Sequence, residues 1–155
     1  IQCAGASDDY AWRLDEQPTF QTRTVIESGT SSTVNQHEFA NQLTHVLDEA
    51  APEVVCIPGW SSFAAFVAME WCVQHRVPVV LMSESSAEDA VRNPVRETIK
   101  RQFIALASAG FVGGTRHRNY LQQLGMPDER IFLGYDAIDN DYFYDAAIRL
   151  RSFQD

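Results

Sequence analysis

The stretch VVCIPGWSSFAAFVAMEWCVQHRVPVVLM, residues 54–82, decides the fold. It opens with a continuous apolar run, 54–57, and closes with a second one, 77–82. Uninterrupted apolar runs of this length are typical of strands that are covered on both faces, as in a parallel sheet. Residues 63–74 between them are apolar nearly all round, which predicts a largely buried helix. The stretch therefore predicts the strand-helix-strand unit of a parallel sheet.

Upstream of this unit the sequence predicts a short strand and a helix. Residues 24–26 (Thr-Val-Ile) are the apolar segment that predicts the strand. Asn35 is a favourable N-cap, and Glu38 follows it three residues later, as in a capping box. The apolar positions that follow have helical spacing, so we expect a helix over 35–50.

Downstream, Asn93-Pro94 is a strong helix start, because a proline at the first helical position loses no hydrogen bond. We expect this helix to bury one stripe and to expose an i,i+4 ion pair on its other side. The predicted stripe is Val95, Ile99, Phe103 and Leu106, and the predicted exposed pair is Glu97 with Arg101.

Two more units complete the pattern. Residues 111–112 and 131–133 predict strands, and 115–124 and the segment from about 141 predict helices. Such alternation predicts an α/β fold over residues 1–155: one Rossmann-like domain with an open parallel sheet and helices on both faces.

Composition excludes several classes of function. The net charge of −9, with Lys100 as the only lysine, disfavours nucleic acid or an anionic membrane surface as a partner. The longest uncharged apolar stretch, 54–69, falls short of the ~20 residues of a membrane span. Three cysteines and four histidines lack metal-ligand spacing, which predicts free thiols in a reducing, cytoplasmic compartment and no metal or bound cofactor.

The loops after the strands are the candidate site, because ligands of open α/β sheets bind at the carboxyl ends of the strands. Glu84, among serines, is the carboxylate that we expect to accept a proton from a hydroxyl or to orient one, which is a catalytic role. An aromatic face suits the apolar face of a sugar, and glycines allow a ligand to approach the backbone. The predicted substrate-binding residues are Gly59, Trp60, Ser83, Ser85, Gly113, Gly114 and Tyr135. The alternatives are a generic polar loop around Glu84, a core role for Trp60 and a plain tight turn at the two glycines.

Residues 53–143 resemble a known family. The motifs are FVGG at 111–114, LG at 124–125, ERIF at 129–132 and GYDAIDNDYF at 134–143. Together with VVCIPGW and VPVVLMSES upstream, they resemble the N-terminal domain of retaining glycosyltransferases of the GT-B type, family 4. GYDAIDNDYF stands where many members have NGVDxxxF.

This resemblance implies an acceptor-binding domain, one half of a GT-B architecture. The full-length enzyme would move a sugar from a nucleotide sugar to a hydroxyl of a glycan or lipid-linked acceptor. A C-terminal donor-binding domain is the implied partner, so we expect the 155 residues to be inactive alone and to self-associate through an exposed apolar edge. Members of the family often have His or Asp where this chain has Ser83 and Glu84. Peripheral binding of the full-length enzyme to the inner membrane is a separate alternative that stays open.

Two other functions stay open. One is a non-catalytic Rossmann-like module that binds a small ligand or a partner. The other is a flavodoxin-like or receiver domain, which is disfavoured because no acidic cluster follows a first strand.

Overall fold

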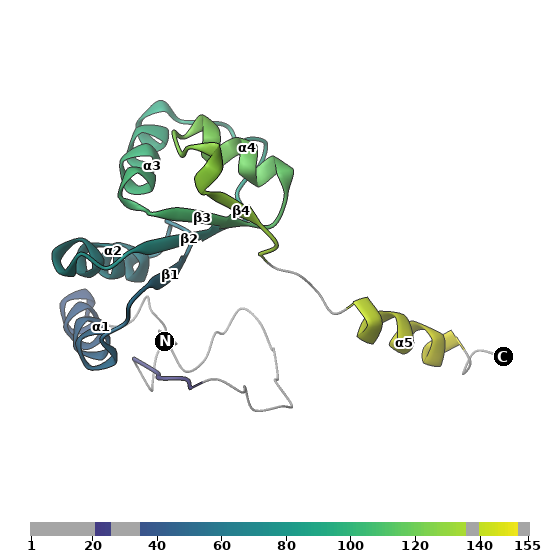
Figure 1. Cartoon of the computed structure of the whole chain (residues 1–155), viewed down its shortest axis with the longest axis horizontal. Helices are drawn as coiled ribbons and strands as arrows, with labels where there is room; N and C mark the ends of the chain where they lie inside the picture. Colours follow the sequence, from purple (N-terminus) through teal and green to yellow (C-terminus); the bar gives the residue numbers. More distant parts are fainter. Residues whose placement is uncertain (1–20, 26–34, 136–139, 152–155) are drawn as a thin grey trace.

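The computed structural model describes residues 21–25, 35–135 and 140–151 (Figure 1). Its centre is a sheet of four parallel strands in the order β1-β2-β3-β4. The strands are β1 (Val55–Pro58), β2 (Val79–Ser83), β3 (Ala109–Val112) and β4 (Ile131–Leu133). The helices are α1 (Gln36–Ala50), α2 (Phe63–His75), α3 (Pro94–Leu106), α4 (Thr115–Gln123) and α5 (Asn140–Arg151), with a 3₁₀ turn η1 (Asp128–Arg130) before β4. The predicted α/β class with an open, parallel, Rossmann-like sheet is confirmed.

The predicted helix starts are confirmed by their caps. The Asn35 side chain accepts the His37 N–H at 2.9 Å, and the Asn93 side chain accepts the Val95 N–H at 3.0 Å. At α2 the Ser62 hydroxyl accepts the Ala65 N–H at 3.2 Å. Each cap satisfies one of the N–H groups that a helix start leaves unpaired, which fixes where the helix begins.

The strand predicted at 24–26 is not a strand of the sheet in its described part. Thr24 forms only an isolated bridge and Val25 a bend, while Ile26 lies outside the described residues. Val25 is nevertheless 8% exposed and belongs to the core cluster. The apolar pattern therefore marked burial correctly, but three residues were too few to specify strand pairing.

The two faces of the sheet differ in burial. On the covered face, most of the alternate residues of β1, β2 and β3 are buried, as at Ile57, Leu81 and Val112, whereas Leu133 at the end of β4 is 47% exposed. The alternate residues form the open face: Cys56, Pro58, Val80, Met82, Ala109, Phe111 and Phe132. None of these open-face residues is buried, and Phe132 is 57% exposed.

The arrangement of the helices explains this asymmetry. Each connection from strand to strand steps in the same direction across the sheet, and right-handed crossovers then place every connecting helix on one side. Figure 1 shows α2, α3 and α4 on the same side of the sheet, with α1 beside α2. We expected helices on both faces of the sheet. Within the described residues, the helices that pack on the sheet cover one face only.

Close packing of α4 on the covered face depends on a glycine in β3. A Cβ at Gly110 would lie 2.6 Å from Leu121 Cδ1 and 2.9 Å from Met126 Sδ. Both neighbours are buried, Leu121 completely. The absence of a side chain at Gly110 thus lets α4 and the turn after it approach the sheet.

The predicted burial of α3 is wrong in most positions. Val95, Ile99 and Leu106 are 68%, 49% and 52% exposed, and only Phe103 of the predicted stripe is buried, with Ile104 beside it. Glu97, predicted to be exposed, has an 18% exposed side chain. The reason is that α3 turns a mixed face inward, where a polar network with α4 replaces apolar packing.

The prediction that α2 is largely buried also needs correction. Phe63, Phe66 and Val73 are 41–50% exposed. Phe66 packs edge-on against Phe103 at 5.2 Å between ring centroids, and with Val73, Ile99 and Leu106 it lines a groove between α2 and α3. The exposed apolar side chains of α2 and α3 therefore line this groove, while the other apolar side chains of α2, among them Val67, Met69 and Cys72, belong to the core.

Candidate functional site

A hollow of about 330 Å³ lies at the carboxyl ends of β1 and β2. Its lining residues are Pro58, Gly59, Met82, Ser83, Glu84, Ser85, Asp89 and Tyr135. Because Pro58 and Met82 belong to the open face, the hollow lies where that face meets the carboxyl edge of the sheet. Five of the eight residues predicted for the site, Gly59, Ser83, Glu84, Ser85 and Tyr135, are thus gathered around one cavity.

The end of β2 sets the position of Glu84. Ser83 is 4% exposed, and its hydroxyl accepts the Ser85 N–H at 3.2 Å, which turns the chain directly after the strand. Glu84 at the tip of this turn is exposed and lines the hollow. The Gly59 N–H donates to the Met82 carbonyl at 2.7 Å, so the two strand ends are held together beneath it.

Asp89 is a site residue that the sequence analysis missed. It lines the hollow from the loop between β2 and α3, and it accepts hydrogen bonds from the Ser86 N–H at 2.6 Å and the Ser86 hydroxyl at 2.5 Å. The hydrogen bonds from Ser86, assisted by the nearby charges of Arg92 and His117, hold the pKa of Asp89 below its ordinary value. The signal in the sequence was Ser86 followed three residues later by Asp89, the spacing of a capping box.

Tyr135 closes the hollow from the side of β4. Gly134 has φ +116°, a conformation that favours glycine, and it turns the chain back over the open face. The Tyr135 ring then lies 6.0 Å from the Phe111 ring, centroid to centroid. Tyr135 therefore covers one end of the open face and forms part of the site at the same time.

The two glycines after β3 lie beside the hollow rather than in its lining. A Cβ at Gly113 would lie 3.2 Å from His117 Nδ1 and 3.5 Å from the Tyr135 carbonyl oxygen. Gly114 is the N-cap of α4, has an extended backbone and borders open space. A side chain at Gly113 would thus reach His117 and the Tyr135 backbone, whereas one at Gly114 would meet open space at the start of α4.

Trp60 does not line the hollow. It is half-buried and packs against the core, with its ring edge-on to Tyr120 at 6.2 Å and the Lys100 ammonium 5.7 Å from its centroid. The structure therefore places Trp60 behind the strand ends, beside α3 and α4. This is the core position that the sequence left open as the alternative to a sugar-binding face.

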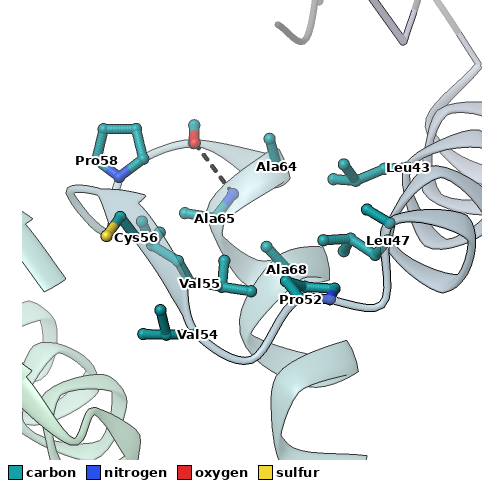
Figure 2. A pocket seen from close by; sticks show the side chains of 13 residues that line it. Leu43, Leu47, Pro52, Val54, Val55, Cys56, Pro58, Ala64, Ala65 and Ala68 are labelled. Atoms are coloured by element: carbon teal, nitrogen blue, oxygen red, sulfur yellow. Dashed lines mark hydrogen bonds between the residues drawn. The ribbon is translucent and has the colours of Figure 1, made fainter. Parts of the chain in front are cut away.

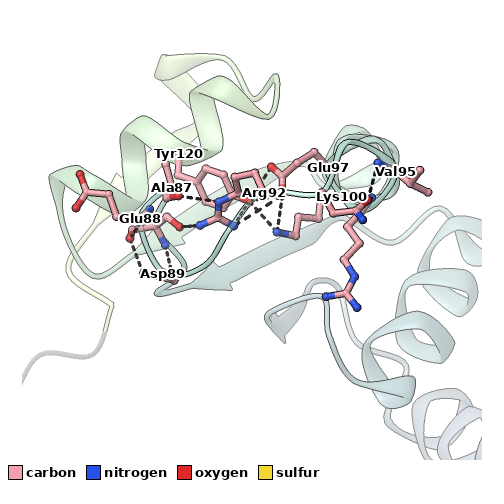
Figure 3. A network of polar contacts seen from close by, with 11 residues as sticks. Ala87, Glu88, Asp89, Arg92, Val95, Glu97, Lys100 and Tyr120 are labelled. Carbon is pink, nitrogen blue, oxygen red and sulfur yellow. Dashed lines mark hydrogen bonds and ion pairs between the residues drawn. The ribbon is translucent and has the colours of Figure 1, made fainter.

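A polar network holds the loop between β2 and α3 from behind (Figure 3). The Arg92 guanidinium donates to the Ser86 and Ala87 carbonyls and to the Tyr120 hydroxyl, and it lies 4.5 Å from the centre of the Tyr120 ring. Tyr120 is only 2% exposed. Its hydroxyl accepts a hydrogen bond from Lys100 Nζ at 2.8 Å and donates one to the Glu97 carboxylate at 2.8 Å. These bonds tie the loop that carries Glu84 and Asp89 to helices α3 and α4.

The network balances burial with charge pairing. Burial alone would raise the pKa of Glu97, but hydrogen bonds from Lys100 and Tyr120 lower it. Burial alone would likewise lower the pKa of Lys100, and its bonds to Glu97 and Tyr120 raise it. Burial raises the pKa of Tyr120, so its hydroxyl stays protonated and can donate to Glu97. The network is therefore a paired, structural set of charges.

His117 lies in the first turn of α4. Its Nδ1 is buried and has no hydrogen-bond partner among the described residues. A Cβ at Gly113 would lie 3.2 Å from this nitrogen, and the charge of His117 helps to lower the pKa of Asp89. His117 is therefore near the site but not among the residues that line it.

A larger cavity, of about 440 Å³, lies beside β1 (Figure 2). Side chains of α1, α2 and β1 form it, among them Leu43, Leu47, Val55 and Ala68, and no charged side chain lines it. Ser62 is the one polar side chain among its described lining residues, and its hydroxyl already accepts the Ala65 N–H at the start of α2. The smaller hollow, where polar groups converge, is for this reason the better candidate site.

No group of three or more His, Cys, Asp or Glu side chains among the described residues could hold a metal ion. Within the same residues, no helix combines the length and apolarity needed to cross a bilayer.

No family model matches the sequence, and no curated protein matches it. Similar solved structures include a UDP-N-acetylglucosamine 2-epimerase with 15% identity and a TM-score of 0.52, covering 73% of this chain and 33% of that one. The structure of S. aureus MnaA with UDP has 19% identity and a TM-score of 0.51, covering 72% and 30%. The UDP-N-acetylglucosamine 2-epimerase from Rickettsia bellii has 17% identity and a TM-score of 0.50, covering 71% and 28%.

The chain thus spans a third or less of the length of these structures. At such identities the likeness shows the fold alone, and that fold is GT-B-like. The GT-B-like expectation is confirmed, while assignment to glycosyltransferase family 4 stays a prediction.

Proposed function

We propose that the chain is the acceptor-binding domain of a retaining, GT-B-type glycosyltransferase that resembles family 4. A donor-binding domain outside these residues would supply the nucleotide sugar, and the hollow would bind the glycan or lipid-linked acceptor. One observation carries the proposal: five of the eight residues predicted for the site line a single hollow at the carboxyl edge of a parallel sheet.

In this proposal Glu84 acts on the acceptor hydroxyl. Its carboxylate accepts a hydrogen bond from that hydroxyl and orients the oxygen toward the sugar carbon of the donor. The turn at Ser83 and Ser85 positions Glu84, and the network behind the loop keeps the turn in place. The similar solved structures include MnaA with UDP and a UDP-N-acetylglucosamine 2-epimerase, which agrees with a nucleotide sugar as the donor.

The test is an assay of the full-length, two-domain protein that the proposal implies. It would be incubated with nucleotide sugars and with neutral glycans or lipid-linked sugars, and the products would be identified by mass spectrometry and NMR. We expect a hexose to be added to the acceptor, and Glu84→Gln to lower kcat/KM by about 10²–10⁴-fold. Glu88→Gln is the matched control, because Glu88 is exposed, pairs with Arg116 and does not line the hollow.

Other outcomes would favour other functions. Inversion of UDP-N-acetylglucosamine at C2 without transfer would contradict the proposal and indicate an epimerase. Sugar binding without turnover would favour the second candidate, a non-catalytic binding module with a Rossmann-like fold.

A further inference from the structure

The cavity of about 440 Å³ beside β1 has an almost entirely apolar lining (Figure 2). Val55 of β1 and Leu47 of α1 lie on either side of Ala68 from α2. The volume of the cavity lies within the range of about 300–1,000 Å³ that is typical of small-molecule sites. No charged side chain is among the described residues that line it, and the Ser62 hydroxyl already accepts the Ala65 N–H. A hydrocarbon chain therefore matches this lining, whereas an ion or a free sugar would lose hydrogen bonds there.

Small side chains and the position of β1 keep the cavity open. β1 is the outermost strand of the described sheet, and three alanines of α2 line the cavity, Ala64, Ala65 and Ala68. At the inner end, Leu47 is 2% exposed and belongs to the core. Along the strand, Cys56 is exposed. The cavity therefore has a closed apolar end and an open side through which a chain can enter.

The cavity meets the hollow at the end of β1. Pro58, the last residue of this strand, lines both spaces. On one side of it the hollow has polar lining residues, such as Ser83 and Ser85, and on the other side the lining of the cavity is apolar. A ligand that joins a polar head to an apolar chain can therefore occupy the two spaces together.

From this continuity we propose that the cavity beside β1 binds the hydrocarbon chain of a lipid-linked acceptor, while the sugar of that acceptor lies in the hollow. The inference rests on the proposed function, and it selects the lipid-linked acceptor over a soluble glycan. Each CH₂ group that leaves water for the cavity should raise the affinity about fourfold, until the chain fills the space. The cavity then supplies most of the affinity, and the hollow orients the reacting hydroxyl.

The experiment uses the 155-residue chain in a Cys3→Ser background, with alkyl glucosides below their critical micelle concentrations. Methyl, hexyl and octyl β-glucoside carry the same sugar on chains of increasing length, and 1-octanol carries the chain alone. The rate at which a disulfide reagent modifies Cys56 reports on the cavity, and the ¹⁵N amide signals of Ser85 and Tyr135 report on the hollow. We expect all three glucosides to shift both amide signals. Octyl glucoside should protect Cys56 at concentrations about tenfold below those that hexyl glucoside requires.

One pair of variants tests the volume of the cavity. Ala68→Leu places a larger side chain in the cavity and should weaken octyl glucoside about tenfold, while methyl glucoside changes less than about twofold. Ala105→Leu is the matched control, because Ala105 is exposed on α3 and lines neither the cavity nor the hollow. It should leave both affinities within about twofold of the parent chain.

A second pair tests the polarity of the cavity at exposed positions, where a substitution does not disturb the core. Val54 lines the cavity and is 49% exposed. Val54→Asp should weaken octyl glucoside at least about tenfold, because a bound chain would remove water from the carboxylate. Val91→Asp adds the same charge at a residue that is 99% exposed and outside the cavity, and it should change the affinity less than about twofold. Equal effects within either pair would overturn the proposal, because the chain would then bind elsewhere, for instance in the groove between α2 and α3.

The remaining outcomes separate this inference from the proposed function. If methyl glucoside shifts Ser85 and Tyr135 and the longer chains bind no better, the inference is wrong while a sugar-binding hollow stands. If Cys56 resists the reagent in the ligand-free chain, another segment covers the cavity and the inference is again wrong. If octanol protects Cys56 but no glucoside shifts Ser85 or Tyr135, the hollow is not a sugar site, and the proposed function fails together with the inference.

Discussion

The covered and open faces of the sheet are built from alternate residues of the same strands, yet they differ in almost every physical respect. Leu81 is 0% exposed under the helices, while its neighbour Met82 contributes to the hollow on the open face. The covered face stabilises the fold through close packing. The open face and the strand ends beside it carry the groups that can bind a ligand. Because successive residues of a strand point to opposite faces, neighbouring residues serve packing on one side and the candidate site on the other.

The largest expected effect is a difference between two neighbouring truncations. Leu81→Ala opens a cavity in the covered face and should lower the free energy of unfolding by about 2–5 kcal/mol. Met82→Ala removes a partly exposed side chain and should cost about 1 kcal/mol or less. Urea denaturation followed by circular dichroism measures both. Equal losses would mean that the open face is covered in solution.

Thiol labelling compares the two sides by a second route. In a Cys3→Ser background, Cys56 on the open face is exposed, whereas Cys72 in α2 is 1% exposed and burial raises the pKa of its thiol. We expect a disulfide reagent to modify Cys56 at least about a hundredfold faster than Cys72, which requires local opening. Mass spectrometry after peptide digestion gives both rates. A protected Cys56 would contradict the open face.

An added methyl group tests the tight packing at β3. Gly110→Ala would place its Cβ 2.6 Å from Leu121 Cδ1, so we expect a loss of about 1–3 kcal/mol in unfolding free energy. Gly114→Ala is the control, because its Cβ would meet no atom within 4 Å and its backbone is extended. The control should cost less than about 1 kcal/mol. Thermal and urea denaturation measure the unfolding free energy of both variants. Equal losses in the two variants would mean that the packing around Gly110 relaxes to accept a methyl group.

The smallest effect concerns the polar network on the covered side and depends on pH. The pKa of Glu97 is lower in the folded protein, so its stabilising contribution exists above the pKa of the unfolded chain and is lost as the pH falls. Glu97→Gln should cost about 1–2 kcal/mol at neutral pH, and the difference from the parent chain should shrink below about pH 4.3.

A surface ion pair is the control for this pH series. Asp128 pairs with Arg118 at the surface, and hydrogen bonds from Arg118 lower the pKa of Asp128. Asp128→Asn should give a smaller loss than Glu97→Gln, because solvent screens an exposed pair. A pH-independent cost at Glu97 would show that its carboxylate contributes by shape rather than by charge.

Much of the fold could be predicted because local rules determine it. The caps at Asn35 and Asn93 and the apolar runs of β1 and β2 carry their meaning within a few residues. The burial of α3 could not be predicted in this way. Its apolar stripe has the right spacing, but the partner of its inner face is Tyr120, twenty residues beyond Lys100, and a polar pair faces inward as a result.

The site shows the same division. Glu84 and its serines were found because they directly follow a strand, and strand ends meet at one edge of a parallel sheet. Trp60 satisfied the same criterion, but its ring packs against Tyr120 and not into the hollow. Asp89 was missed because it lies six residues beyond the strand end, and only the folded loop brings it to the rim.

The sequence by itself determined the alternation of strands and helices, the capped helix starts and the loops that follow the strands, because hydrophobic periodicity and capping act over a few residues. The tertiary structure decided which face of the sheet the helices cover, which charges are paired behind the loop and which residues line the hollow. Those choices depend on contacts between segments that are far apart in the chain, so packing and charge pairing settle them only when the sheet is assembled.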